Sequence, residues 1–162
     1  MTFTEWQTLL ALISMFFSLT IAQTIKFVTW SINDKKPHWR ALIATGGWPS
    51  SHSALVISLT ASLALSTPGF LFLSTYFAIS VALSIVVIHD AMGVRLEASK
   101  HAERINEMTK TLSEQGLVEA PKKKLKIKLG HRPYEVLLGV LLGIIIALIC
   151  YLIFKYAIPY VV

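Results

Sequence analysis

The feature that most constrains this chain is an almost purely apolar stretch, VLLGVLLGIIIALICYLIF, within residues 134 to 158. A bilayer core about 30 Å thick is crossed by roughly 20 apolar residues in a helix. Residues 6 to 32, 50 to 67 and 70 to 89 have the same character. Because backbone groups find no water in lipid, these segments are predicted to be helices. The expected fold is therefore all-α, an integral membrane bundle of four transmembrane helices.

Composition supports a membrane protein. Hydrophobic residues make up 54% of the chain and charged residues 15%, whereas a soluble domain carries about 25% charged residues. A soluble globule, a disordered tail and a collagen-like fibre are thus excluded. The one cysteine, Cys150, has no partner for an intramolecular disulfide. We expect a single membrane domain over residues 1 to 162, with no nucleic-acid partner because no nucleic-acid-binding motif is present.

The long polar segment, residues 90 to 133, separates the third apolar stretch from the fourth. Within it, apolar residues recur every three or four positions: Val94, Ala98, Ala102, Ile105, Met108 and Leu112. This spacing predicts an amphipathic helix of about five turns on the protein or lipid surface. The tract KKKLKIKLG follows it, and Ser66-Thr67-Pro68-Gly69 predicts a tight turn between the second and third stretches.

Basic residues are distributed unevenly along the chain. With four crossings, the polar links at 33–49 and 90–133 lie on one side and hold 13 of the 15 Lys and Arg residues. Positive charge gathers on the cytoplasmic side of membrane proteins. We therefore expect a multi-pass protein of the cell membrane, with both termini outside and the two links in the cytoplasm.

The motif GGWPSSHSA, residues 46 to 54, stands where the second stretch begins. Serine is a preferred N-cap, and the free N–H groups of a first helical turn attract anions. Ser50 and Ser51 are thus candidate phosphate-binding residues, with His52 directing an imidazole at the bound group. The alternative is a Gly-Pro turn and a helix cap, with His52 an interfacial polar residue.

The motif LGHRPYEV, residues 129 to 136, opens the fourth stretch. His131 and Glu135 are four residues apart and can share a helix face. A carboxylate that holds one imidazole nitrogen leaves the other free as a nucleophile or base. The alternative is a capped helix start with an incidental pair.

The motif HDAMGVR, residues 89 to 95, closes the third stretch. Arg95 is a candidate for binding an anion bidentately. Asp90 is either functional, as in a metal site, or a structural partner of Arg95. Lys26 either snorkels to the interface or contacts a ligand. The topology brings these motifs, Lys26 and Arg40 to one membrane face, a constellation suited to phosphoryl transfer.

In the order TGGWPSSHSA, HDAMGVR and LGHRPYEVLLG, the sequence resembles the divergent branch of the type 2 phosphatidic acid phosphatase superfamily, related to vanadium-dependent haloperoxidases. The resemblance implies a membrane phosphatase that hydrolyses a lipid phosphate or diphosphate, without metal or cofactor. It makes His131 the nucleophile that forms a phosphohistidine, His52 the general acid and Glu135 the orienting carboxylate. Arg95 would grip the phosphate, with Ser50, Ser51, Lys26 and Arg40 as further contacts.

The sequence departs from the usual pattern at several points. Ser51 replaces a glycine, Val94 precedes Arg95 in place of serine, and residues 96 to 130 separate Arg95 from His131 in place of five. Two other functions stay open: a non-catalytic protein that binds anionic lipid or a partner through residues 96 to 130, and a metal-dependent phospholipid transferase using Asp90. The small-xxx-small pair Gly139 and Gly143 is expected to pack helices within the chain, and a homodimer is left open.

Overall fold

A computed structural model describes residues 3–43, 46–67, 69, 74–119, 121, 123–125 and 132–157. Its elements are α1 (Phe3–Asp34), the 3-10 helix η1 (Trp39–Ile43), α2 (Ser51–Ser66), α3 (Thr75–Met92), α4 (Val94–Glu114) and α5 (Pro133–Ala157). The all-helical class is therefore confirmed. The helix from Phe3, the helix from Thr75 and α5 are long and apolar enough to cross a membrane. The apolar helix α2 has only 16 residues, so a fourth crossing stays a prediction.

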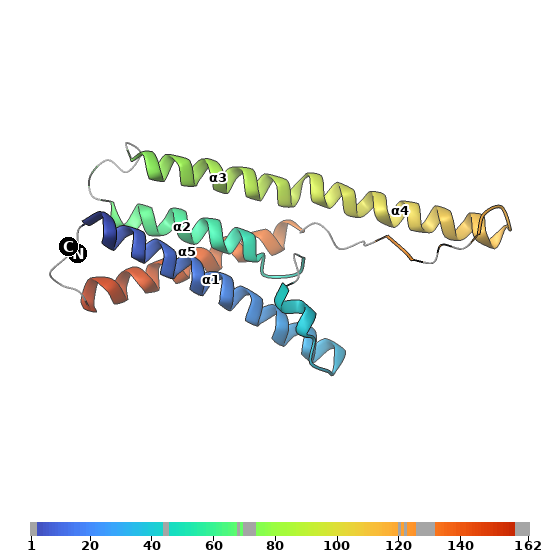
Figure 1. Ribbon diagram of the computed structural model, residues 1–162, viewed down its shortest axis with the longest axis horizontal. Helices are drawn as coiled ribbons and strands as arrows, with labels where there is room; N and C mark the ends of the chain where they lie inside the picture. Colours follow the sequence, from blue (N-terminus) through green and yellow to red (C-terminus); the bar gives the residue numbers. More distant parts are fainter. Residues whose placement is uncertain are drawn as a thin grey trace.

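The helices α1, α2 and α5 pack together, and α3 lies against α2 (Figure 1). The start of α1 and the end of α5 lie at one end of this bundle (Figure 1). The last turns of α1, the start of α2, the end of α3 and the start of α5 are at the other end. The described parts of the three sequence motifs therefore lie at the same end of the bundle.

Two glycines on α5 allow it to approach α2 closely. A Cβ atom at Gly139 would collide with the backbone oxygen of Ser50, and one at Gly143 would lie 2.6 Å from the backbone oxygen of Ala54. Small residues at such positions let membrane helices pack backbone to backbone. The small-xxx-small pair therefore packs within the chain and fixes the start of α2 against α5.

Hydroxyl and amide groups link the helices through the bundle. Ser18 of α1 and Ser58 of α2 are hydrogen-bonded at 2.8 Å, and Gln7 Nε2 donates to the backbone oxygen of Ser66 at 3.1 Å. Thr60 of α2 pairs with Ser84 of α3 at 2.9 Å. Such bonds between membrane helices contribute about 0.6 kcal/mol each. Close packing and several small polar contacts therefore hold the bundle together.

The long polar segment begins with α4, which prolongs α3 beyond the bundle after a break at Gly93 (Figure 1). The sequence predicted an amphipathic helix on the protein or lipid surface in this segment. The outer part of α4 leaves Ile105 and Met108 50% and 65% exposed, and its placement on a lipid surface stays a prediction. Of the predicted turn between α2 and α3, Pro68 lies outside the described residues, as do residues 70–73. Helix α3 begins at Thr75, later than the expected residue 70.

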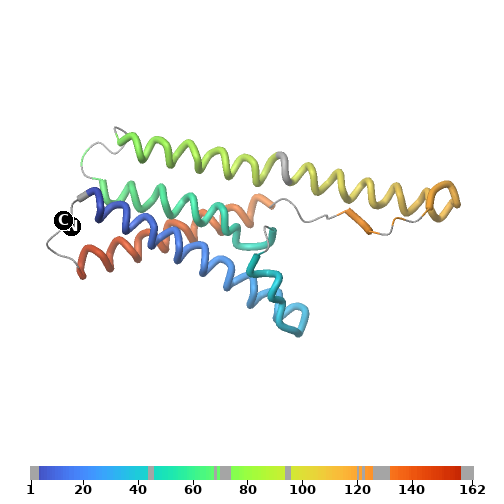
Figure 2. The backbone as a smooth tube through the Cα atoms, viewed as in Figure 1, coloured from blue at the N-terminus to red at the C-terminus, as the bar shows by residue number. Residues whose placement is uncertain are grey.

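Part of the basic tract is held beside α4 (Figure 2). The amide of Asn106 donates to the backbone oxygen of Leu125 at 3.0 Å and accepts from its N–H at 2.9 Å. The two bonds give this side chain the pairing pattern of a neighbouring strand. Asn106 therefore anchors the chain as it returns toward α5.

Replacing Asn106 with alanine is expected to release this anchor. The two hydrogen bonds together are expected to contribute about 1 kcal/mol. Their loss should therefore raise the rate of tryptic cleavage after Lys123 and Lys124 roughly fivefold. Limited proteolysis followed by mass spectrometry measures the rate. The control is Thr109→Ala, since the Thr109 hydroxyl bonds only within α4, to the backbone oxygen of Ile105. Equal cleavage of both variants would contradict the anchoring role.

Candidate functional site

A cleft of about 600 Å³ opens at the motif-bearing end of the bundle. Four parts of the chain line it: the end of α1, the segment before α2, the first half of α4 and the start of α5. The lining residues are Trp30, Asn33, Gly47, Trp48, Leu96, Ser99, Lys100, Glu103, Arg132, Tyr134 and Glu135. The volume lies within the range of small-molecule sites, about 300–1,000 Å³.

The start of α2 is built as an N-cap beside this cleft. Ser50 caps the helix, and its Oγ accepts from the Oγ of Ser53 at 2.9 Å. The backbone N–H of Ser50 donates to the backbone oxygen of Glu135 at 2.9 Å, which ties α2 to the first turn of α5. Gly47 has a φ of 88° and lies against the Trp30 ring, where a Cβ would be only 3.0 Å from a ring carbon. Glycine at this position thus permits the close approach of the loop to α1.

Lys26 lies in the interior, beneath the start of α2. Its side chain is 0% exposed, and Nζ donates to the Oγ of Ser51 at 2.9 Å. The negative charge of Glu135 acts on this ammonium group from α5. Lys26 therefore does not snorkel to the interface, because a buried partner and a nearby carboxylate offset the cost of burying its charge.

Glu135 lies between the buried Lys26–Ser51 hydrogen bond and the cleft. Its side chain is half-buried and lines the cleft. Oε2 accepts from the backbone N–H of Arg132 at 3.0 Å, an arrangement resembling the capping box at a helix start. The capped start of α5 that the sequence offered as an alternative is thus present.

The other predicted site residues lie in different settings. His52 is exposed on the first turn of α2 and Arg40 is exposed in η1, and the described lining of the cleft contains neither. Asp90 is half-buried near the end of α3. His131 and the side chain of Arg95 lie outside the described residues. The structure therefore brings together Lys26 and Ser51, with Ser50 and Glu135 beside them.

Residues 8–146 match the profile described as the divergent PAP2 family. The chain belongs to the divergent PAP2 family. This membership confirms the resemblance drawn from the three motifs.

A relative of this divergent PAP2 protein is known from Bacillus subtilis (strain 168). It is named "Uncharacterized membrane protein YuiD" and is 34% identical over 137 residues, which cover 79% of this chain and 85% of the relative. No solved structure matches the chain. The relative and the apolar helices together support a PAP2-related membrane protein.

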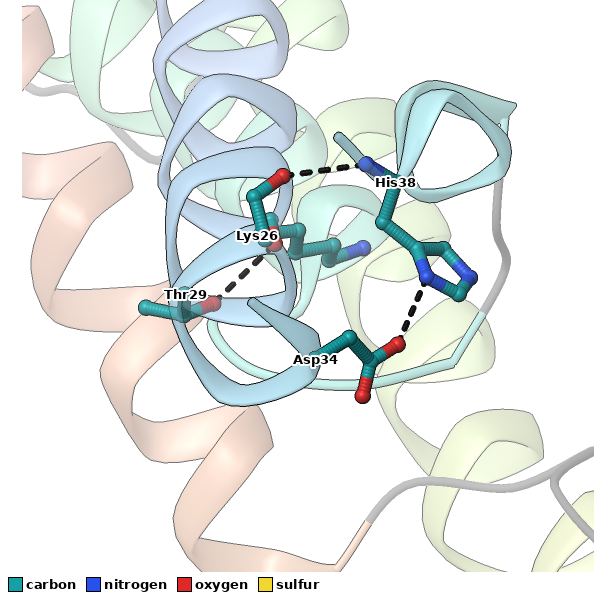
Figure 3. Close-up of polar contacts among 5 residues, drawn as sticks. Lys26, Thr29, Asp34 and His38 are labelled. Atoms are coloured by element: carbon teal, nitrogen blue, oxygen red, sulfur yellow. Dashed lines mark hydrogen bonds and ion pairs between the residues drawn. The ribbon is translucent and has the colours of Figure 1, made fainter. Parts of the chain in front are cut away.

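An Asp–His pair at the end of α1 was not predicted from the sequence. His38 Nδ1 lies 2.7 Å from Asp34 Oδ2, and its backbone N–H donates to Ser31 Oγ at 3.0 Å (Figure 3). The ring meets Trp30 edge-on, with 5.3 Å between centroids. The signal was present in the sequence, since Asp34 and His38 have the same four-residue spacing as His131 and Glu135. Trp30 links this pair to the cleft.

The contribution of α4 to the cleft was also not predicted from the sequence, and among its described side chains four line the cleft. Within the part of the chain that the structure describes, no group of three His, Cys, Asp or Glu residues is placed to hold a metal ion.

Proposed function

We propose that this divergent PAP2 protein is a membrane phosphatase that hydrolyses a lipid phosphate or diphosphate through a phosphohistidine intermediate. The observation that carries the proposal is the hydrogen bond from Lys26 Nζ to Ser51 Oγ, with Glu135 of α5 beside it. Three segments distant in sequence thus place a cation, a helix N-terminus and a carboxylate at one point.

The charges at the start of α2 favour the binding of a tetrahedral anion. The first turn of α2 presents N–H groups that attract negative charge. Lys26 adds a fixed positive charge beneath them, and Arg95 at the start of α4 is the candidate for gripping the phosphate oxygens. Such preorganised charge stabilises the charge that develops on phosphorus oxygens in the transition state.

The proposed reaction proceeds in two steps. His131 attacks phosphorus while the bond from phosphorus to the leaving oxygen breaks, and His52 donates a proton to that oxygen. Water then gives a proton to His52 and attacks the phosphohistidine, the phosphorus–nitrogen bond breaks, and inorganic phosphate is released. Glu135, one turn after His131, is assigned to orient the imidazole. His52 would have to turn toward the phosphate as substrate binds.

The position of the cleft suits an amphiphile. It lies where the apolar helices end and polar segments begin, so a lipid tail can stay in the bilayer while its phosphate enters. By the charge bias, this end is assigned to the cytoplasmic face of the cell membrane.

Phosphate release tests the proposal. Full-length protein in detergent micelles is incubated with phosphatidic acid, phosphatidylglycerol phosphate or an isoprenoid diphosphate. We expect release from at least one of them and inhibition by vanadate, which mimics pentacoordinate phosphorus. Inertness on all three would overturn the proposal. Activity that chelator abolishes would favour a metal-dependent transferase using Asp90.

A further inference from the structure

The inner half of α4 forms one wall of the cleft. Leu96, Ser99, Lys100 and Glu103 line it, and their spacing of three and four residues places them on one helix face. Arg132 and Tyr134 at the start of α5 also line the cleft. This wall comes from residues 96 to 130, the segment that lengthens the spacing between Arg95 and His131. The extra segment therefore helps to shape the site as well as connecting two helices.

The described lining carries charges of both signs. Lys100 and Arg132 supply two cations, and Glu103 and Glu135 supply two carboxylates. Hydroxyl groups suit a lining of mixed charge, since they donate to carboxylates and accept from ammonium and guanidinium groups.

The positions of the charged groups on α4 support the same conclusion. Lys100 Nζ lies 2.6 Å from Glu97 Oε1, and this hydrogen bond lowers the pKa of the Glu97 carboxyl. Lys100 is thereby engaged by a carboxylate from outside the cleft. Among the described residues, no ion pair engages Glu103. Its carboxylate is therefore available to accept hydrogen bonds in the cleft.

We propose that this face of α4 recognises the substrate headgroup and selects lipid phosphates whose headgroup carries hydroxyl groups. The inference rests on the proposed phosphatase function and adds a specificity determinant to it. Glu103 accepts hydrogen bonds from the headgroup hydroxyls, and Trp48 covers the carbon skeleton of the headgroup. The reacting phosphate binds deeper, at the start of α2.

Two substrates with the same acyl chains test this selection. Phosphatidylglycerol phosphate presents a hydroxylated headgroup, whereas phosphatidic acid presents the phosphate alone. We expect Glu103→Gln to lower the ratio of their kcat/KM values about tenfold, mainly through KM, because a neutral amide oxygen replaces a charged hydrogen-bond acceptor. Glu107→Gln is the matched control, since Glu107 is an exposed carboxylate one turn further along α4 and outside the cleft lining.

The outcomes separate this inference from the phosphatase proposal. An unchanged ratio in Glu103→Gln, or a wild-type preference for phosphatidic acid or an isoprenoid diphosphate, would overturn headgroup selection while leaving the phosphatase intact. Binding gives a readout without turnover: tryptophan fluorescence is titrated with glycerol 3-phosphate and with inorganic phosphate, using Trp48→Phe to assign the signal. The protein could bind glycerol 3-phosphate more tightly than inorganic phosphate, lose this difference in Glu103→Gln, and yet release no phosphate from any lipid. That result would support the headgroup site and refute the phosphatase. Equal binding of the two probes would refute the headgroup site.

Discussion

Replacing His131 with alanine should lower phosphate release from the preferred lipid by about 10³-fold or more, the usual scale for loss of a covalent nucleophile. In the proposed mechanism, the phosphohistidine cannot form without this imidazole. The helix that follows should be unaffected, because α5 begins at Pro133 and is capped through Arg132 and Glu135. The measurement is kcat in detergent micelles, with thermal unfolding followed in parallel.

The control for this variant is His101→Ala. His101 is exposed on α4 and is not among the residues that line the cleft. We expect its kcat to match that of wild type. If His131→Ala retains wild-type kcat on the best substrate, another group is the nucleophile, and the Asp34–His38 pair becomes the next residue pair to vary.

Replacing Gly139 with alanine should destabilise the protein by about 1–3 kcal/mol, the cost of overpacking a close contact. Helix propensity alone predicts the opposite sign, a gain of about 1 kcal/mol for glycine to alanine in a helix interior. The packing term should dominate because the added methyl meets the backbone of α2 at Ser50, not a movable side chain. Thermal unfolding of the solubilised protein shows directly whether Gly139→Ala lowers or raises the stability.

Gly143→Ala should act in the same direction, since its methyl would lie 2.6 Å from the backbone oxygen of Ala54. Leu141→Ala is the control, because the Leu141 side chain is 48% exposed on α5. An increase in melting temperature for Gly139→Ala would show that α5 does not pack on α2 through this residue. Activity should fall with stability, because Ser50 also bonds to Glu135 across this contact.

Patterns within single segments predicted much of this fold. The apolar stretches predicted the helices, and Ser50 indicated where α2 begins. The spacing of Gly139 and Gly143 predicted a close-packed helix face. Periodicity and capping depend on neighbours in sequence, so they are visible without coordinates.

The details that depend on distant segments were harder to predict. The sequence left Lys26 open between snorkelling and ligand contact, because Ser51 and Glu135, which offset its burial, are remote in sequence. The role of α4 was hidden for a related reason. Its apolar positions predicted contact with a surface. Ser99, Lys100 and Glu103 line the cleft only because the fold places them beside the start of α5, which is remote in sequence.

The arrangement of the chain ends has a practical consequence. Phe3 opens α1 and Ala157 closes α5 at the end of the bundle remote from the cleft (Figure 1). A reporter fused to either end would leave substrate entry unobstructed. Because the fused reporter and the cleft lie at opposite ends of the bundle, the accessibility of the reporter in intact cells would test the prediction that the cleft faces the cytoplasm.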